Sequence, residues 1–330
     1  MRRSTTVRGG IAVAVILVLG LGGLAACSGG GSTPPVPTGT GTSAATPTPT
    51  ASVDTAADHA ALSAITVNGA AGAKPTLTLP SKPFTVTSQV ARTVDQGTGT
   101  AVAQGDLVTL HVLEVSGADG SERGNTWTDG TPVVTTVDSA SFFTELYQQL
   151  TAAHVGSRIL LAAPTTDSSG NALTVVDLLE ISATQTVPPR ASGAPVAPVA
   201  GLPTITLDAN GKPSMTKSTA AAPTTLVVQP LIQGSGPVVA KGQTVVVHYT
   251  GWLWDGTQFD SSWDRGATFP VQNIGQAQVI DGWNEGLVGQ KVGSQVLLVV
   301  PPDKGYGSTA NGSIPANSTL VFVVDILAAA

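Results

Sequence analysis

The sequence predicts an α+β fold in which two similar domains follow one another. Runs rich in β-branched residues, with turn residues between them, predict strands at about 225–233, 244–252, 268–273, 294–300 and 319–327. A single helix is plausible at 281–288; because it is short and contains glycine, it must be held by packing against a sheet. An internal repeat implies that a second copy of the fold precedes this one.

The second of these strands carries the first functional signal. Strand alternation places Val245, Val247 and Tyr249 on one face, and Val246 and His248 on the other. An apolar face that ends in a tyrosine is compatible with a pocket, because a buried phenol needs a hydrogen-bond partner. A tyrosine that only packs in the core is the alternative, and this strand alone favours neither.

The internal repeat is recognised from matched segments in the same order. The matched pairs are 65–75 with 205–213, 96–111 with 233–248, 155–164 with 292–301, and 175–179 with 323–327. We therefore expect one domain at 53–183 and another at 204–330, joined by a solvent-exposed Pro/Ala linker at 184–203.

Five motifs of the second copy occur in a specific order. They are VVHYTG at 246–251, DGT-x-FDSS at 255–262, VI-x-GW at 279–283, GYG at 305–307, and IP at 314–315 followed by TLVF at 319–322. In combination they closely resemble the FKBP-type peptidyl-prolyl cis-trans isomerases over about residues 224 to 327. The resemblance implies that each domain is a twisted antiparallel sheet wrapped around a short helix. It also implies isomerase activity without a cofactor.

The same resemblance assigns roles to individual residues. Those expected to act in catalysis are Tyr249, Asp260, Ile280, Trp283, Tyr306 and Phe322, with Trp283 as the floor of the pocket. Substrate-binding residues are expected to be Phe259, Phe269, Val279 and Ile314, and Arg265 is expected to brace Asp260. For each aromatic residue the alternative is core packing, which fits Phe322 as well as a pocket role does. A surface or turn-capping role is the alternative for Asp260.

Two departures from the family pattern concern loops beside the expected pocket. The loop at 307–314 is one residue shorter than in familiar members, and one extra residue lies between Phe269 and Val279. We expect catalysis to survive both changes. Substrate preference and the affinity for macrolides of the rapamycin type are the properties that these loops would alter.

The first copy differs from the second where the expected pocket lies. Val112 stands opposite Tyr249, and Arg123-Gly124 lies near the counterpart of Phe259-Asp260. We therefore expect residues 53–183 to keep the fold without the activity. Such a domain could act as a spacer, a substrate platform or a dimer surface.

The first 26 residues read as a bacterial lipoprotein signal peptide. A basic start and a short apolar run precede Leu24-Ala25-Ala26-Cys27, which is similar to a lipobox. Cys27 is the only cysteine and is the expected lipidation site; a buried or idle thiol is the alternative. Residues 27–52, rich in Gly, Thr and Pro, predict a disordered tether. These features predict a protein anchored by lipid on the extracytoplasmic face of the cell membrane.

Charge and histidine spacing exclude other functions. Without the signal the chain has twelve basic against twenty-one acidic residues, which does not favour nucleic-acid binding. His59, His111, His154 and His248 are scattered, so no metal site is expected. Asp208-Ala209-Asn210-Gly211 resembles the start of a calcium loop but lacks its final glutamate.

The leading hypothesis is therefore a prolyl isomerase that acts on proline-containing segments of exported proteins. The first alternative is a chaperone or scaffold that binds such segments in the same pocket without catalysis. The second is an inert spacer, which gives no reason for one copy to keep the whole pocket.

Overall fold

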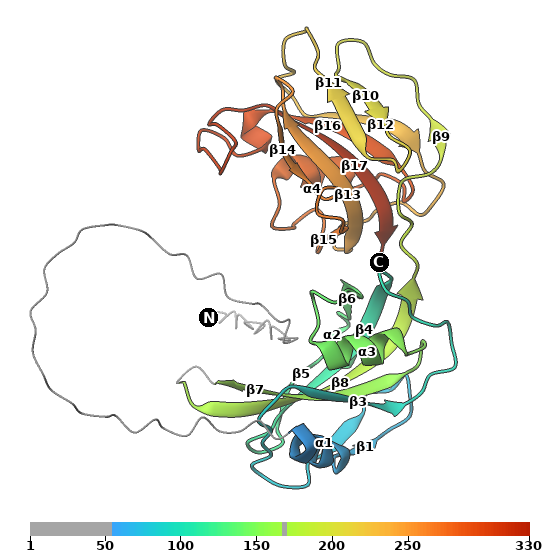
Figure 1. Ribbon diagram of the computed structural model, residues 1–330, viewed down its shortest axis with the longest axis vertical. Coiled ribbons are helices and arrows are strands. Elements are labelled where there is room, and N and C mark those ends of the chain that lie inside the picture. Colours follow the sequence, from blue (N-terminus) through green and yellow to red (C-terminus); the bar gives the residue numbers. More distant parts are fainter. Residues whose placement is uncertain (1–54, 167–169) are drawn as a thin grey trace, which may run out of the picture.

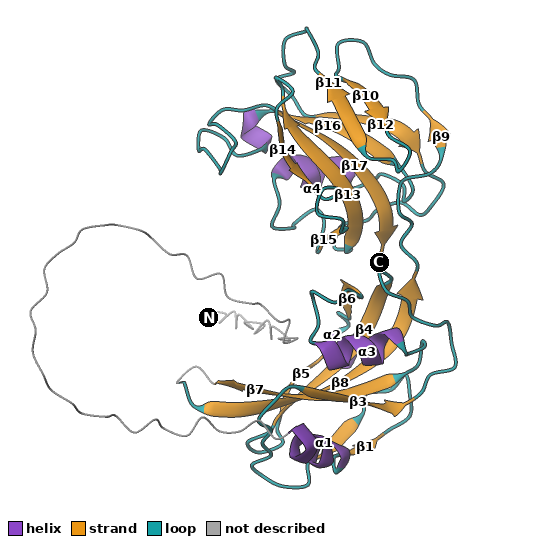
Figure 2. Ribbon diagram, viewed as in Figure 1, coloured by secondary structure: helices purple, strands orange, loops and turns teal. Residues whose placement is uncertain are grey.

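The computed structural model describes residues 55–166 and 170–330 as an α+β protein with antiparallel sheets and few helices (Figure 1, Figure 2). The predicted signal at 1–26, the lipidation site at Cys27 and the tether at 27–52 lie outside the described residues. Within the described ranges, no helix combines the length and apolar character needed to cross a membrane.

The C-terminal sheet has the strand order β14-β13-β17-β16-β12-β9, and β15 also pairs with β13. Its strands are β9 (Ala194–Pro195), β12 (Val227–Gln233), β13 (Val245–Leu253), β14 (Gln258–Ser261), β15 (Phe269–Val271), β16 (Gln295–Val300) and β17 (Leu320–Ala329). Helix α4 (Asp281–Leu287) precedes β16, and the 3₁₀ helix η1 (Pro302–Lys304) follows it. The five predicted strands and the predicted helix are confirmed; β9 and β14 were not predicted.

The N-terminal sheet has the order β3-β7-β8-β4-β5, with β6 paired to β4. Its strands are β3 (Val90–Asp95), β4 (Leu107–Ser116), β5 (Glu122–Asn125), β6 (Val133–Thr136), β7 (Arg158–Thr166) and β8 (Ala172–Gln185). The short helix α2 (Thr126–Asp129) follows β5, and α3 (Thr144–Thr151) precedes β7. This strand order is that of the C-terminal sheet without β9.

Each sheet is covered on both faces. One face of the C-terminal sheet packs against α4, through Trp283 and Leu287. The other face is covered by a hairpin of β10 (Thr204–Leu207) and β11 (Pro213–Thr216), whose Ile205 and Met215 pack against the buried cluster that contains Trp252. In the N-terminal sheet, α3 covers one face, and α1 (Thr55–Ser63) with the hairpin β1 (Thr66–Asn68) and β2 (Thr76–Thr78) covers the other.

Side chains of β13 alternate between these faces as predicted. Val245, Val247 and Tyr249 lie in the core beneath α4. His248 points to the other face, where it stacks on Trp263 with a centroid distance of 4.2 Å. In the N-terminal sheet, His111 stacks on Trp127 at 5.0 Å. The outer faces of the two sheets therefore share a local arrangement as well as a strand order.

The match of 175–179 with 323–327 is wrong by three residues. Strand pairing places Glu180 opposite His111 and Arg158, as Asp325 lies opposite His248 and Gln295. Residues three apart on a strand point to opposite faces. The matched Asp177 therefore lies on the face covered by α3, and Glu180 lies on the face covered by α1 and the β1–β2 hairpin. Both acidic residues follow an apolar pair, which explains why sequence matching chose the wrong one.

The predicted linker at 184–203 is partly built into the C-terminal sheet. Residues Ala194–Pro195 form β9, which pairs with the end of β12. The Ala191 N–H donates to Asp325 Oδ2 at 2.8 Å, and Ala191 is buried. Burial raises the pKa of the Asp325 carboxyl, and the hydrogen bond from Ala191 opposes that shift. The expectation of a linker open to solvent is therefore wrong for Ala191, whereas Ala194 and Pro195 pair with β12 and stay exposed.

A small apolar cluster joins the two sheets. Leu107 of β4 packs with Val246 and Ala328 of the C-terminal sheet, and Val134 and Val187 lie against them. In Figure 1 the end of β17 accordingly lies next to the beginning of β4.

We predict that residues 187–330 are more stable than residues 204–330. The shorter fragment lacks β9 and leaves Asp325 Oδ2 without the Ala191 donor. A buried polar group that loses its partner costs about 1–3 kcal/mol of unfolding free energy. Urea denaturation of the two fragments measures the difference. Equal midpoints and slopes would contradict a structural role for the linker.

Candidate functional site

Helix α4 lies very close to β16 because two of its residues are glycines. A Cβ atom at Gly282 would lie 2.6 Å from Val300 Cγ1, and one at Gly286 would lie 2.7 Å from Leu298 Cδ2. No larger residue fits at either position unless the Val300 or Leu298 side chain moves. This close approach places Trp283 against the sheet, where only 4% of it is exposed.

Aromatic rings meet edge to face around Trp283. Its ring centroid lies 5.1 Å from that of Tyr249, with an interplanar angle of 86°, and 5.4 Å from that of Phe322, with an angle of 85°. Phe269 lies 6.2 Å from Trp283, and Phe259 lies 5.5 Å from Phe322. Edge-to-face pairs at such distances are favourable beyond their apolar burial. The rings therefore form a fixed cluster from four strands and one helix.

Gly251 of β13 makes room for two of these rings. A Cβ atom there would lie 2.6 Å from Phe259 Cζ and 2.9 Å from Phe322 Cε1. The aromatic pair and the glycine therefore depend on each other.

Three polar residues at the rim, Tyr249, Asp260 and Arg265, hydrogen-bond to one another. The Tyr249 hydroxyl donates to one oxygen of Asp260, and Arg265 Nη1 donates to the other. Arg265 Nη2 also donates to the Tyr249 hydroxyl at 2.9 Å. Burial, and then the hydrogen bond to Asp260, raise the pKa of Tyr249 to about 12. The phenol is consequently neutral at physiological pH, and Arg265 lies beside Asp260 as expected from the sequence.

A cavity of about 210 Å³ lies within this cluster. Nine of the eleven predicted site residues line it: Tyr249, Phe259, Asp260, Phe269, Val279, Ile280, Trp283, Tyr306 and Phe322. Ile314 is instead buried in the core cluster that contains Trp283, and Arg265 stands behind the rim. Gln278 also lines the cavity and was not singled out in the sequence, where only its place beside Val279 could have indicated it.

Two potential hydrogen-bond donors border the cavity. Ile280 precedes α4, and among the described residues none accepts a hydrogen bond from its N–H. Tyr306 lies between two glycines after η1 and is 38% exposed. In the parts of the chain that the structure describes, no group of three His, Cys, Asp or Glu side chains could hold a metal ion.

The N-terminal sheet carries charged residues at the corresponding positions. Glu114 pairs with Asp177, as Gly251 pairs with Phe322 in the C-terminal sheet. Glu114 also pairs with Gly124, as Gly251 pairs with Asp260, so that the preceding residues Arg123 and Phe259 correspond. A charged trio of Glu114, Arg123 and Asp177 thus replaces the aromatic trio of Gly251, Phe259 and Phe322.

The charged trio is held by one ion pair. Arg123 Nε donates to Glu114 Oε1 at 2.6 Å, whereas Glu114 Oε2 and Asp177 Oδ1 are buried with no partner among the described residues. Asp177 is only 1% exposed. Burial, and then the charge of Glu114, raise the pKa of the Asp177 carboxyl well above its usual value, and Arg123 opposes the shift.

Comparisons with known proteins concern the C-terminal part. Residues 236–327 match a family model described as FKBP-type peptidyl-prolyl cis-trans isomerase. The chain is 47% identical over 106 residues to "FK506-binding protein 1" of Aspergillus oryzae, which covers 29% of this chain and 91% of that protein. It is 49% identical over 102 residues to "Peptidyl-prolyl cis-trans isomerase Fkbp12" of Drosophila melanogaster, covering 30% of this chain and 94% of that protein.

A bacterial relative and one solved structure were also found to be similar to parts of this chain. "FK506-binding protein" of Neisseria meningitidis serogroup A is 45% identical over 103 residues, covering 31% of this chain and 94% of that protein. The crystal structure of FkpA from Escherichia coli shares 35% identity, with 40% of this chain and 52% of that chain covered and a TM-score of 0.30.

We predict that Asp177→Asn stabilises the protein at neutral pH. A raised folded-state pKa means that the folded chain holds a proton that the unfolded chain releases, so stability falls as pH rises above the unfolded value near 3.8. The amide cannot ionise and escapes this loss. Thermal midpoints from pH 4 to 8 should therefore diverge in favour of the variant as pH rises.

Asp129→Asn, at an exposed position, is the matched control and should change little at any pH. A lower midpoint for Asp177→Asn at pH 7 would mean that Asp177 is ionised and stabilised by Arg123.

Proposed function

The chain belongs to the FKBP-type peptidyl-prolyl cis-trans isomerases, and we propose that residues 204–330 catalyse rotation about the amide bond before proline in polypeptide substrates. The observation that carries the proposal is the aromatic cavity over Trp283. It combines an apolar floor with neutral hydrogen-bond donors and a rim whose one carboxylate is already paired.

Rotation about an X-Pro amide needs a particular environment rather than a reactive group. The C–N bond has partial double-bond character, and the uncatalysed reaction takes about 10–100 s at 25 °C. In the twisted amide the nitrogen loses its conjugation and the carbonyl oxygen loses negative charge. An apolar site that excludes water favours this state over the planar amide. No nucleophile or general base is required.

Each residue of the cavity has a proposed role in this reaction. Trp283 supports the proline ring as the floor, and Phe259, Phe269 and Phe322 enclose it with Val279. The Ile280 N–H and the Tyr306 hydroxyl donate to substrate carbonyl oxygens. This role is consistent with the unused Ile280 N–H and with the exposure of Tyr306.

The rim residues balance the one negative charge beside the cavity. Asp260 receives hydrogen bonds from both Tyr249 and Arg265, so its charge is balanced before a substrate arrives. Tyr249 is oriented by the same bonds and packs edge to face on Trp283. We propose that the three rim residues position Tyr249 as a wall of the pocket, with Arg265 as structural support.

The same cavity is proposed to bind macrolides. Relatives that are 45–49% identical over this region carry the name FK506-binding protein or Fkbp12. The proposed ligand class is therefore FK506 and other macrolides of the rapamycin type, in competition with the polypeptide.

The N-terminal half is proposed to lack isomerase activity. Arg123 and Asp177 stand where aromatic rings line the C-terminal cavity, and a buried carboxyl group is a poor neighbour for an apolar proline ring. The half would act as a spacer, a substrate platform or a dimer surface.

The site of action is proposed from the N-terminal sequence. The lipobox-like segment ending at Cys27 supports a lipoprotein on the outer face of the cell membrane, and residues 27–52 would tether the folded part to it. The polypeptide substrates would then be exported proteins that fold outside the membrane.

We predict that Trp283→Leu lowers kcat/KM for a proline tetrapeptide by at least about tenfold, because the variant loses the pocket floor; tenfold corresponds to about 1.4 kcal/mol of transition-state stabilisation. The assay is the cis-to-trans rate with the described chain from residue 55 onward, with and without FK506. Trp254→Leu, on the other face of the sheet, is the matched control and should keep the rate.

Acceleration that FK506 blocks would support the enzyme and its pocket together. Peptide binding without acceleration, by a protein shown to be folded, would favour the non-catalytic chaperone or scaffold.

We predict a flat dependence of kcat/KM on pH between about pH 7 and 9. Tyr249 keeps its proton until the pH approaches its pKa of about 12. Burial lowers the pKa of His248 below its usual value of 6.5, so that this ring is neutral throughout the range. A bell-shaped profile within this window would indicate general acid–base catalysis and contradict the mechanism.

A further inference from the structure

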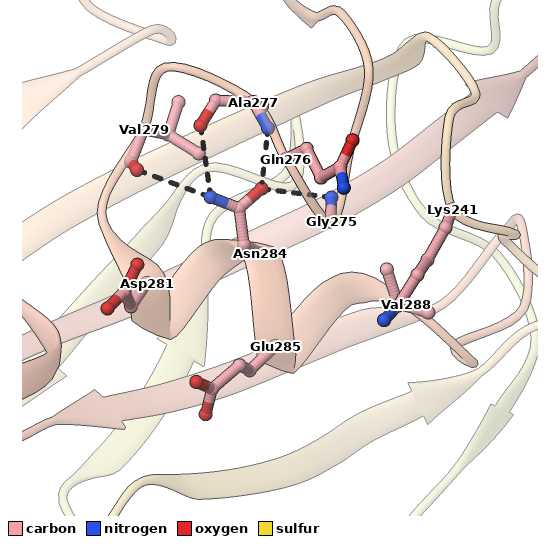
Figure 3. Close-up of a pocket in the computed structure, with 9 residues that line it drawn as sticks. All are labelled: Lys241, Gly275, Gln276, Ala277, Val279, Asp281, Asn284, Glu285 and Val288. Carbon is pink, nitrogen blue, oxygen red and sulfur yellow. Dashed lines mark hydrogen bonds between the residues drawn. The ribbon is translucent and has the colours of Figure 1, made fainter. Parts of the chain in front are cut away.

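One side chain of α4 binds the backbone of the loop that leads into this helix. Asn284 Oδ1 accepts hydrogen bonds from the N–H groups of Gly275 and Ala277, both at 2.9 Å. Its Nδ2 donates to the carbonyl oxygens of Ala277, at 3.0 Å, and Val279, at 3.3 Å. Figure 3 shows the carboxamide of Asn284 directed into the curve of this loop, with all four bonds drawn.

The four bonds use the full capacity of a carboxamide, which has two acceptor and two donor sites. An aspartate has no donor for the two carbonyl oxygens, and a leucine has neither donor nor acceptor. A glutamine would place the same group one bond further from the helix. The position therefore calls for asparagine if both kinds of backbone group are to be satisfied.

No other described residue hydrogen-bonds to the backbone of residues 277–279. The loop is also open on both sides. Val279 lines the aromatic cavity and also a second cavity, of about 620 Å³, bordered by Lys241 and Glu285 (Figure 3). The loop packs on the core beneath α4 through Ala277 and Val279, but the side-chain hydrogen bonds to its backbone come from Asn284. Its position consequently depends on Asn284.

The hydrogen bond from Asn284 to the Val279 carbonyl affects the Ile280 N–H, which is the proposed donor to the substrate. The Val279 carbonyl and the Ile280 N–H belong to one peptide unit, which is planar and, when trans, directs these two groups in opposite directions. Fixing the carbonyl towards Asn284 therefore turns the N–H away from it. Hydrogen bonding at the carbonyl also polarises the peptide and strengthens its N–H as a donor.

We propose that Asn284 is a positioning residue of the isomerase site, which aims the Ile280 N–H into the cavity and holds Val279 as its wall. The inference rests on the proposed function, since it concerns a donor to the substrate. It assigns a catalytic consequence to a side chain that does not itself line the aromatic cavity.

The test compares three variants of the chain from residue 55 onward with the wild type. Asn284→Ala removes all four bonds and should lower kcat/KM by about 10- to 100-fold, as expected for a misplaced binding group. FK506 affinity should fall in parallel. Glu285→Ala, the next residue on the exposed side of α4, is the matched control and should retain the wild-type rate.

Asn284→Asp supplies a readout that general destabilisation would not give. Its ionised carboxylate keeps two bonds but sets an oxygen against the carbonyls of Ala277 and Val279, whereas its protonated form can donate again. Activity should therefore be low at pH 8 and recover several-fold towards pH 5, while the wild type and Asn284→Ala show no such recovery. The amide NMR signal of Ile280 should shift in both Asn284 variants and follow the same pH dependence in Asn284→Asp.

The outcomes separate the two proposals. A folded wild-type chain with no isomerase activity would overturn the proposed function. An active wild type whose Asn284→Ala variant keeps kcat/KM within twofold, or whose Asn284→Asp variant shows no pH dependence, would overturn the role of Asn284 alone. If Asn284→Ala fails to fold, the isosteric Asn284→Asp decides.

Discussion

The close contact of α4 with β16 is the constraint on which the C-terminal site depends. A helix of seven residues cannot form alone, and Gly282 and Gly286 let it lie against the sheet at a distance that excludes side chains. Trp283, between them in sequence, is thereby carried into the aromatic cluster. Helix α3 of the N-terminal half has no glycine and covers its sheet with Leu146 and Leu150 instead. The same architecture thus supports a close-packed, glycine-containing helix beside a hollow in one half and a helix that packs through leucines in the other.

The two trios at corresponding strand positions are each consistent only as a set. Phe259 and Phe322 need a glycine at 251, because any Cβ there would collide with both rings. Glu114 in the other half needs Arg123, since a buried carboxylate without a cation is costly. Exchanging a single member would leave either a clash or an unpaired charge.

The sequence was sufficient for the parts of the fold that depend on local patterns. Five of the seven strands of the C-terminal sheet, the short helix and the faces of β13 follow from β-branched runs and alternation. Asp177 pairs with Glu114 because of the strand register. The sequence leaves this register ambiguous, because Asp177 and Glu180 each follow two apolar residues on the same strand. Strand β9 was missed because its Pro/Ala composition is typical of an open linker, and only the free edge of β12 makes it a strand.

Of the residues that line the cavity, all but Gln278 were predicted, and all of those except Phe269 lie within the named motifs. Nine predicted residues line the cavity together, because adjacent strands carry five of them and α4 with its flanking loop and the loop after η1 carry the other four. Gln278 lies there because the path of its loop is set by side-chain bonds from the helix, which no periodicity encodes. Asn284 gave no signal in the sequence for the same reason.

The pairing of the linker with the C-terminal sheet limits how far the two halves can separate. Only residues 186–190 lie between the end of β8 and the first backbone group bound to Asp325. Fully extended, such a segment spans about 20 Å. The two halves therefore cannot move independently over long distances. Any polypeptide that contacts one half is held within a small search volume around the other, and meets it at a high effective concentration without a binding surface shared between them.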